Sequence, residues 1–390
     1  MTDILFLAHR VPYPPDRGDK IRSHQVLRHL SARARVHLLA FADDPADETP
    51  HPELLSLCAS CTIVSRRKGR VRATLEALAS GRPVSLAAFD HPAMRAAVAR
   101  APRTDATYCF SGQMAQYLPA GRPAIMDFVD VDSAKFAQMA ATAALPLRPL
   151  LRREAASLRR FERDVARRVD ASLFVTEAEA ALFRQGGGEG RIVAVENGID
   201  ARRFAPDAAF ERLHEPGPLI VFTGQMDYAP NIDAVTRFAR EVLPAVRQRH
   251  RTARFAIVGR AATPAVRALA GDGVVVTGAV PDVRPWLSAA AVCVAPLRLA
   301  RGIQNKVLEA MAMARPVVAS PGAAEGIDHA GTIAVADTAA EWVEQVSAAL
   351  DGAGQGAAAR RQVIARYDWS ARLRPLDALL GLNPPVRAAA

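Results

Sequence analysis

The sequence predicts an α/β protein with two domains, each organised around a parallel β-sheet. Three observations support this fold class. Short apolar runs alternate with amphipathic stretches along all 390 residues, which is typical of parallel sheets covered by helices on both faces. The alternation stops once, in a segment rich in proline and glycine around residues 206–217. Half of the residues are hydrophobic, so each of two domains can bury its own core.

The first domain is predicted to span residues 1–205. Its buried strands are expected in the apolar runs at residues 4–8, 36–41, 62–64, 107–110, 124–128, 173–175 and 192–195. Helical patterns lie between most of these runs. Thr176 and Glu179 have the spacing of a capping box, which predicts that a helix begins after Thr176.

After a linker at residues 206–217, a second domain is predicted over residues 218–366. Its strands are expected at residues 219–222, 255–258, 274–277, 292–294, 317–319 and 332–335. Thr338 and Glu341 again have capping-box spacing. Residues 367–390 are predicted to contain a final amphipathic helix, whose apolar face has to dock on another part of the protein. That face carries Leu373, Leu376, Leu379 and Leu380.

The composition excludes several classes of protein. A chain that is half hydrophobic is not intrinsically disordered, and four cysteines in 390 residues indicate a reducing compartment. Cys58 and Cys61 form a C-x-x-C pair without a second pair, so we expect small buried side chains there and no metal. The first eight residues are expected to form a strand and not a signal peptide. No charge-free stretch of about 20 apolar residues is present, so we expect a cytoplasmic protein.

The positive charge of the chain, +10 in total, predicts an anionic partner such as a nucleotide, a nucleic acid or a membrane surface. Most of the excess lies in the first domain. A predicted helix at residues 148–168 carries eight arginines, while Leu147, Leu151, Leu158 and Val165 form a stripe that is expected to face the core. The simplest interpretation of the arginines is a solvated face. The alternative is a patch that binds an anionic membrane surface.

Residues 295–319 carry the strongest chemical signal. A predicted strand is followed by a loop containing Gly302, then by a helix and another strand. The free N–H groups and the dipole at such a helix start favour a phosphate group. Arg301 and Lys306 add positive charge at the same end. Glu309 lies on the same helix face as Lys306, one turn beyond a bound diphosphate, and is expected to accept both hydroxyls of a ribose.

This segment resembles the nucleotide-sugar site of glycosyltransferase family 4, which has the two-domain Rossmann-like architecture called GT-B. In that family an E-x7-E motif precedes a small-rich helix, and Glu309 matches the second glutamate, which holds the ribose. Arg301 stands at the position of the first glutamate, so the pattern departs there, and we expect it to pair with the diphosphate. Donor contacts are also assigned to Gly302, Ile303 and Gln304. The Arg-Gly-Ile-Gln-Asn-Lys variant resembles a subgroup of sugar transferases associated with exosortase and exopolysaccharide systems.

Two further segments resemble the family in the expected order. Residues 196–204 resemble its N-G-[VI]-D…F interdomain signature. Residues 222–234 occupy the first strand–loop–helix of the second domain, where most family members carry an arginine and a lysine for the diphosphate. Those positions are not basic here, and Arg301 and Lys306 are expected to supply the missing positive charge for the diphosphate. Gly224, which allows close backbone approach, and Asn231 are predicted to bind the donor; for Gly224 a tight turn is the alternative interpretation.

In the first domain, residues 14–22 follow the first strand and open the first helix, which resembles the family's glycine loop. This predicted acceptor loop contains Arg17, Gly18, Asp19, Lys20 and Arg22. Gly18 and Asp19 are expected to face the donor phosphate or the acceptor, while Lys20 and Arg22 are expected to hold an anionic acceptor. The alternative is an N-capped turn between a loop and a helix.

A second group of polar residues ends another predicted strand. Asp127, Asp130 and Asp132 alternate along the chain, so they share one face if the strand continues. Asp130 or Asp132 is predicted to touch the donor sugar or to coordinate a cation, with a solvated loop as the alternative. His9, at the end of the first strand, is expected either to line the cleft or to be a structural residue.

Taken together, the segments predict a retaining GT-B glycosyltransferase whose two domains face a cleft and whose C-terminal helix crosses back to the first domain. The resemblance implies a nucleotide diphosphate sugar as donor, with no obligate cofactor and no metal. Arg301, Lys306 and Asp130 are the predicted catalytic residues. The expected acceptor is a saccharide or a polyprenyl-linked saccharide. The expected role is in bacterial exopolysaccharide or glycan biosynthesis. The protein is expected to bind the inner face of the plasma membrane peripherally.

Two other functions remain open at this point. One is an isomerase similar to the nucleotide-sugar 2-epimerases, which share the fold. The other is a non-catalytic GT-B protein that binds a saccharide or a lipid, because the first glutamate and the basic pair are missing. Nucleic acid is not expected as a partner, since no basic motif with interleaved aromatic residues is present.

Overall fold

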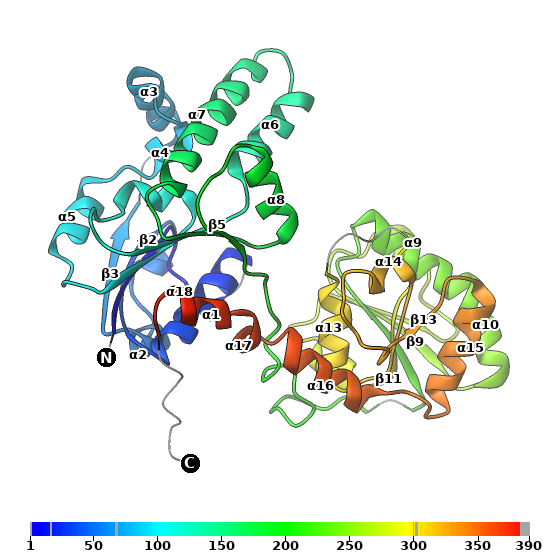
Figure 1. Ribbon diagram of the computed structural model, residues 1–390. Helices are drawn as coiled ribbons and strands as arrows, with labels where there is room; N and C mark the ends of the chain where they lie inside the picture. The colour runs from blue at the N-terminus through cyan, green and yellow to red at the C-terminus, as the bar shows by residue number, and fades with distance from the viewer. Residues whose placement is uncertain are drawn as a thin grey trace. The chain divides into compact units, whose positions relative to one another are not determined.

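The computed structural model describes residues 2–15, 18–66, 69–214, 216–298, 300 and 303–382. The chain divides into two compact units (Figure 1). The first unit contains Met1–Asn197 together with Arg372–Ala390, and the second contains Gly198–Ala371. The division therefore falls at Asn197, before the predicted linker, and residues 206–217 lie within the second unit.

The first unit is built on a seven-stranded sheet in which all neighbouring strands are parallel. In sheet order the strands are β3 (Ser60–Ser65), β2 (Arg35–Ala42), β1 (Asp3–Ala8), β4 (Ala106–Phe110), β5 (Ala124–Val129), β6 (Ala171–Phe174) and β7 (Ile192–Ala194). The central strands are buried along nearly their whole length, because helices cover both faces. This burial explains why the apolar runs were recognisable as strands.

Helices connect these strands and cover the sheet (Figure 1). They are α1 (Gly18–Ser31), α2 (Pro52–Leu57), α3 (Arg70–Ser80), α4 (Val84–Ala88), α5 (Pro92–Arg100), α6 (Asp132–Thr142), α7 (Arg148–Ala166) and α8 (Glu177–Gln185). On α7, Leu151, Leu158 and Val165 are buried as predicted, but Leu147 precedes the helix and is exposed. At α8, Thr176 caps the helix, whereas Glu179 accepts a hydrogen bond from Val131 N, so the predicted capping box is only half formed.

The second unit is built on a six-stranded parallel sheet. In sheet order the strands are β10 (Val274–Gly278), β9 (Arg254–Val258), β8 (Leu219–Thr223), β11 (Ala290–Ala295), β12 (Val317–Ala319) and β13 (Ala334–Val335). Its core packs Phe238 against Phe255 and Trp342. The predicted fold class, two Rossmann-like α/β domains, is thereby confirmed.

The helices of the second unit follow the same alternation. They are α9 (Ala229–Arg237), α10 (Leu243–Arg249), α11 (Pro264–Arg267), α12 (Arg284–Ala289), α13 (Asn305–Ala312), α14 (Pro321–Ala324), α15 (Ala339–Leu350) and α16 (Gly356–Arg366). The capping box predicted from Thr338 and Glu341 is complete at α15. No helix in the described part of the chain is long and apolar enough to cross a membrane.

The predicted C-terminal helix is divided into two short helices, α17 (Trp369–Arg372) and α18 (Arg374–Leu379). From Arg372 onward the chain belongs to the first unit, where α18 lies beside α1 (Figure 1). Leu376 is fully buried, and the Asp377 carboxylate accepts a 2.7 Å hydrogen bond from His29 on α1. The apolar face of this segment thus docks on the first unit.

Candidate functional site

The strand order of both sheets places the best binding positions at their carboxyl edges. In each sheet the direction of strand succession reverses once, between β1 and β4 in the first unit and between β8 and β11 in the second. Ligands of open α/β sheets bind outside the carboxyl ends of the strands at such a switch point. Gly224 follows β8, and the loop that leads to α13 follows β11.

The loop after β8 is held tightly against the loop after β9. Gly224 N donates to Val258 O, and Met226 N donates to Arg260 O, at 3.0 and 2.9 Å. Gly259 has a φ of +150°, and a Cβ at this position would lie 1.7 Å from Gly224 O. Only glycine fits there. The two loops therefore form one fixed backbone surface at the edge of the sheet.

Lys306 is the cation at the centre of this edge. Its side chain comes from the first turn of α13, its Nζ donates a 2.8 Å hydrogen bond to Asn231 Oδ1, and it stands 4.0 Å from the centre of the Phe222 ring. A Cβ on Gly224 would lie 3.2 Å from the same Nζ. Burial lowers the pKa of Lys306 to about 8. Among the described residues this ammonium has no carboxylate partner within salt-bridge distance.

Asn231 and Arg260 link Lys306 to the rest of the loop. Asn231 is buried, and its Nδ2 donates to Gln225 O at 2.9 Å. Arg260 Nη2 donates to Gln225 Oε1 at 3.1 Å. A guanidinium from the loop after β9 therefore reaches the Gln225 side chain, which stands in the segment expected from the resemblance to carry basic residues.

Glu309 lies one helical turn after Lys306 on α13. Burial raises the pKa of Glu309 to about 7, while Arg203 and Lys306 act in the opposite direction. Arg360 fixes the segment that carries Arg203, because its guanidinium donates to Ala201 O, to Phe204 O and to the carbonyl of Ala312 at the end of α13. Glu309 thus lies within electrostatic range of two cations, Arg203 and Lys306.

The start of α13 completes the described part of this region. Gln304 occupies the N-cap position with extended backbone, and no described side chain caps the helix. Ile303 packs against the core of the second unit. Arg301 and Gly302 lie outside the described residues. The structure brings Gly224, Asn231 and Lys306 together, with Gln304 and Glu309 on the helix that carries Lys306.

In the first unit, the predicted acceptor loop is more internally paired than the sequence indicated. Gly18 begins α1, and Asp19 accepts hydrogen bonds from His9 and Arg10 that lower its pKa. Lys20 is only 2% exposed, and its Nζ donates to both Asp47 oxygens at 3.0 and 3.1 Å. The charge of Lys20 is thus buried and paired within the unit, and its predicted role toward an anionic acceptor stays a prediction. Arg17 lies outside the described residues.

Arg22 is also a structural residue and not a surface cation. It is 1% exposed, and its guanidinium donates to Asp127 Oδ2, Val195 O and Asn197 Oδ1 at 2.9, 2.7 and 3.0 Å. Tyr108 donates to the same Asp127 oxygen at 2.6 Å. The predicted role of Arg22 toward an acceptor stays a prediction. Through these three partners, Arg22 holds the last residues of the segment Met1–Asn197 in place.

The three aspartates do not share a strand face, because β5 ends at Val129, which has a φ of +72°. Asp127 is fully buried, whereas Asp130 is part-exposed and accepts a 2.6 Å hydrogen bond from Lys135. Asp132 begins α6, and burial raises its pKa. A β-branched residue with positive φ is a backbone outlier that marks a turn with local strain. Asp130 thus lies at the carboxyl edge, next to a strained residue.

Two features of this region were not assigned a role from the sequence. Arg260 follows a strand that carries no motif, and its contact with Gln225 depends on how β8 and β9 pair. Arg203 was noted only as part of a signature, and its influence on Glu309 depends on the packing of Arg360. The sequence contained one signal for both residues, which is a positive charge in a predicted loop. Arg260 follows a predicted strand, and Arg203 precedes the predicted linker. Among the described residues no group of three or more histidine, cysteine, aspartate or glutamate side chains is arranged to hold a metal ion.

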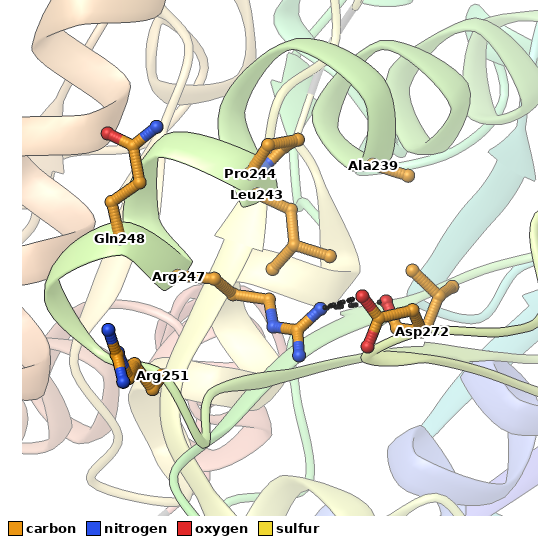
Figure 2. A pocket seen from close by; sticks show the side chains of 8 residues that line it. Ala239, Leu243, Pro244, Arg247, Gln248, Arg251 and Asp272 are labelled. Atoms are coloured by element: carbon orange, nitrogen blue, oxygen red, sulfur yellow. Dashed lines mark hydrogen bonds and ion pairs between the residues drawn. The ribbon is translucent and has the colours of Figure 1, made fainter.

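A separate hollow of about 510 Å³ lies at the amino end of β10 (Figure 2). It is lined by Ala239, Leu243, Pro244, Arg247, Gln248, Arg251, Asp272 and Val274. Arg247 is paired with Asp272 at 2.9 Å. Because this hollow lies away from the carboxyl ends of the strands, it does not belong to the candidate site.

Comparison with known proteins connects this geometry to a class of enzyme. Residues 217–352 match the family model of the group 1 glycosyl transferases. The match lies entirely within the second unit and includes Gly224, Asn231, Lys306 and Glu309. This part of the second unit is therefore similar to the group 1 glycosyl transferases. No curated protein matches the sequence.

Solved structures show the fold of the whole chain. Anabaena HepE in complex with UDP has a TM-score of 0.60 at 16% identity, covering 97% of this chain and 99% of its own. Sucrose-phosphate synthase from Thermosynechococcus elongatus has a TM-score of 0.58 at 18% identity, with coverages of 97% and 98%. A glycosyltransferase from Rickettsia africae has a TM-score of 0.59 at 12% identity, with 97% of each chain covered. The two-domain Rossmann-like architecture of the GT-B type thus extends over nearly the whole chain.

Proposed function

We propose that the protein transfers a sugar from a nucleotide diphosphate sugar to a hydroxyl acceptor, with retention of the anomeric configuration. The observation that carries this proposal is the Lys306 ammonium, which is largely buried at the switch point of the second sheet and hydrogen-bonded to an amide. A cation in this setting favours an anionic ligand, because burial without a counter-charge is unfavourable. The matched glycosyltransferase domain and the UDP bound by HepE support a nucleoside diphosphate as that ligand.

The mechanism is mainly electrostatic. As the bond between the sugar and the diphosphate breaks, negative charge develops on the leaving phosphate. The Lys306 ammonium and the free N–H groups at the start of α13 stabilise that charge from fixed positions. Asn231 orients Lys306, and Glu309 accepts the ribose hydroxyls. Arg260 adds a guanidinium to the same edge. As predicted from the sequence, Arg301 pairs with the diphosphate and Asp130 contacts the donor sugar in the proposed mechanism.

For the acceptor, we propose a saccharide carried by a polyprenyl diphosphate at the inner face of a bacterial plasma membrane, in exopolysaccharide or glycan biosynthesis. This part rests on the resemblance of the Arg-Gly-Ile-Gln-Asn-Lys segment and on the basic first domain. No metal ion or obligate cofactor takes part in the proposed reaction.

The donor site is tested by calorimetry after a thermal-shift screen of UDP-, GDP-, ADP- and dTDP-sugars has identified the nucleotide. Glu309→Ala is expected to weaken donor binding about 10- to 100-fold, because hydrogen bonds to a charged group are lost. The matched control is Glu344→Ala, which removes an exposed glutamate of α15. Equal donor affinity in both variants would reject the role of Glu309.

The reaction type is tested with the same donor. Release of the nucleoside diphosphate that depends on an added acceptor supports transfer. Formation of an epimeric nucleotide sugar without release would replace the proposal with an isomerase. A protein that binds saccharide or lipid, but shows no thermal shift and no release with any donor, would be a non-catalytic member of the fold.

A further inference from the structure

The first unit exposes several large apolar side chains on two neighbouring elements. Among the described residues, Leu145 is 77%, Leu75 64%, Leu78 52% and Leu147 49% exposed. Leu75 and Leu78 lie three residues apart on α3, and Leu145 and Leu147 lie in the turn between α6 and α7. Apolar side chains that gather in this way on a protein surface indicate an interaction site.

These leucines belong to one end of the first unit. Arg153 on α7 donates through Nη2 to Ala77 O, at 2.9 Å, which joins the second turn of α7 to the end of α3. Leu147 precedes Arg153 by six residues, or about 9 Å along a helix axis. Figure 1 shows α3 and the α6–α7 hairpin at the same end of the unit. The four leucines therefore lie on two neighbouring elements at one end of the first unit.

The exposed positions next to Leu145 and Leu147 carry only apolar or basic side chains, whereas α3 also carries Glu76, which is ion-paired with Arg72. Between residues 144 and 160 the exposed residues are Ala144, Leu145, Pro146, Leu147, Pro149, Arg152, Ala156, Arg159 and Arg160. A face that only has to be soluble mixes both signs of charge. No ion pair within the described part of the chain neutralises Arg152 or Arg160, whereas Arg167 further along α7 is paired with Asp164 and Glu189. The positive charge near the leucines is thus available to a partner.

We propose that this surface, formed by α3, the α6–α7 turn and the exposed face of α7, docks on the headgroups of an anionic lipid bilayer. Arginines on the polar side attract the negative surface, and the leucines enter the boundary between headgroups and acyl chains. The two features occur together, which distinguishes this surface from an arginine face that is merely solvated. α6 begins shortly after β5, and the α6–α7 turn lies at the opposite end of that helix. This inference rests on the proposed function in one respect: the lipid-linked acceptor would lie in the membrane on which the surface docks.

The test is cosedimentation of the full chain with vesicles of equal parts phosphatidylglycerol and phosphatidylcholine, compared with phosphatidylcholine alone. Binding is expected for the anionic vesicles and is expected to weaken with added salt. Arg152→Gln combined with Arg160→Gln should weaken it on the order of tenfold at low salt. Leu145→Ser combined with Leu147→Ser should weaken it severalfold while leaving the salt dependence in place.

Matched variants on the second unit serve as controls. Arg249→Gln with Arg251→Gln removes the same charge next to the hollow of Figure 2, and Ile364→Ser removes an exposed apolar side chain of α16. Both should bind like the unmodified protein. Absence of binding to anionic vesicles, or equal losses in controls and test variants, would overturn the proposal. So would a dimer in ultracentrifugation that the leucine variants abolish.

Failure of this inference is distinguishable from failure of the proposed function. Vesicle binding by a protein that binds no nucleotide sugar would reject the enzyme and keep the surface. Donor binding and transfer to a soluble acceptor, without vesicle binding, would reject the surface and keep the enzyme.

Discussion

Lys306 shows how the setting of a single residue determines its chemistry. An exposed lysine is charged at every physiological pH, but burial lowers the pKa of Lys306 to about 8. Asn231 supplies an amide oxygen and no opposing charge. The residue is thus positioned to gain stabilisation when a diphosphate arrives, because the bound anion favours the protonated form.

This setting predicts that nucleotide affinity depends on pH. Below about pH 8 the free protein already carries the ammonium, so the contribution of Lys306 to affinity is expected to be constant. Above it the free lysine is neutral, a proton has to be taken up on binding, and affinity should fall by up to about tenfold per pH unit. Calorimetry with UDP between about pH 7 and pH 9 measures this slope. Lys306→Arg should remove the slope, because arginine stays charged; a flat profile for the unmodified protein would contradict the assignment.

The residues also show which parts of the site could be predicted from sequence. The placement of Lys306 and Glu309 on one helix that follows a strand could be predicted, because local spacing is sufficient for that inference. Lys20 and Arg22 stood in an equally suggestive loop, yet both are buried. Their partners, Asp47 and Asp127, are 27 and 105 residues away, and no local pattern reveals such pairing.

At the scale of single elements, α7 is the main scaffold of its part of the first unit. Glu154 accepts hydrogen bonds from Val84 N and Ser85 N at the start of α4, at 2.7 and 2.9 Å. Glu162 accepts from Ser133 N and Ser133 Oγ at the start of α6, at 2.9 and 2.6 Å. Eight residues separate the two glutamates, so both lie on the buried face of α7. One helix therefore caps the N-termini of two others.

Glu162 gives this arrangement a pH dependence. Burial raises its pKa to about 7, above its ordinary value of 4.5. The folded state therefore binds the proton more tightly than the unfolded state, and stability is expected to fall as pH rises between those two values. Above about pH 7 the loss is on the order of 3 kcal/mol. Glu162→Gln should flatten the profile, measured by urea unfolding at about pH 5 and pH 8.

A surface variant provides the control for that measurement. Glu189 lies in the same unit, is exposed, and has its pKa lowered by the hydrogen bond from Arg167. Glu189→Gln should therefore leave the decline between about pH 5 and pH 8 in place. An unchanged decline in Glu162→Gln would show that another group is responsible.

The elements themselves were largely predictable, whereas their assignment to units was not. Strands of a parallel sheet are buried on both faces, so each appears as a short apolar run that composition alone reveals. The boundary at Asn197 depends on pairing between distant segments. Ile199 N donates to Tyr367 O at 2.8 Å, and Trp369 N donates to Ile199 O at 3.2 Å. These bonds join residues 198–205 to the second unit, ahead of the proline- and glycine-rich segment that signalled a linker.

At the scale of the whole molecule, the first unit is built from both ends of the chain. Residues from Arg372 onward complete it, and Leu373 and Leu376 are buried there. Asp377 binds His29 and Arg33 at 2.7 and 3.1 Å. The second unit is inserted between these two segments, so the chain has to finish the second unit before it can complete the first.

This arrangement predicts that a change near the C-terminus destabilises the N-terminal unit. Leu376→Ala removes a fully buried side chain and should cost the first unit about 2–5 kcal/mol. All three tryptophans, Trp286, Trp342 and Trp369, belong to the second unit. Urea unfolding followed by circular dichroism should therefore shift to lower denaturant, while the transition followed by tryptophan fluorescence stays in place.

The comparison of the two signals determines how the units are coupled. Leu55→Ala, at an exposed position of α2, should shift neither transition and serves as the control for the substitution itself. If Leu376→Ala moves both transitions by the same amount, the units unfold together. The C-terminal segment would then stabilise the molecule as a whole. If only the circular dichroism transition moves, the segment belongs energetically to the unit in which its side chains are buried, and donor binding by the second unit should persist in the variant.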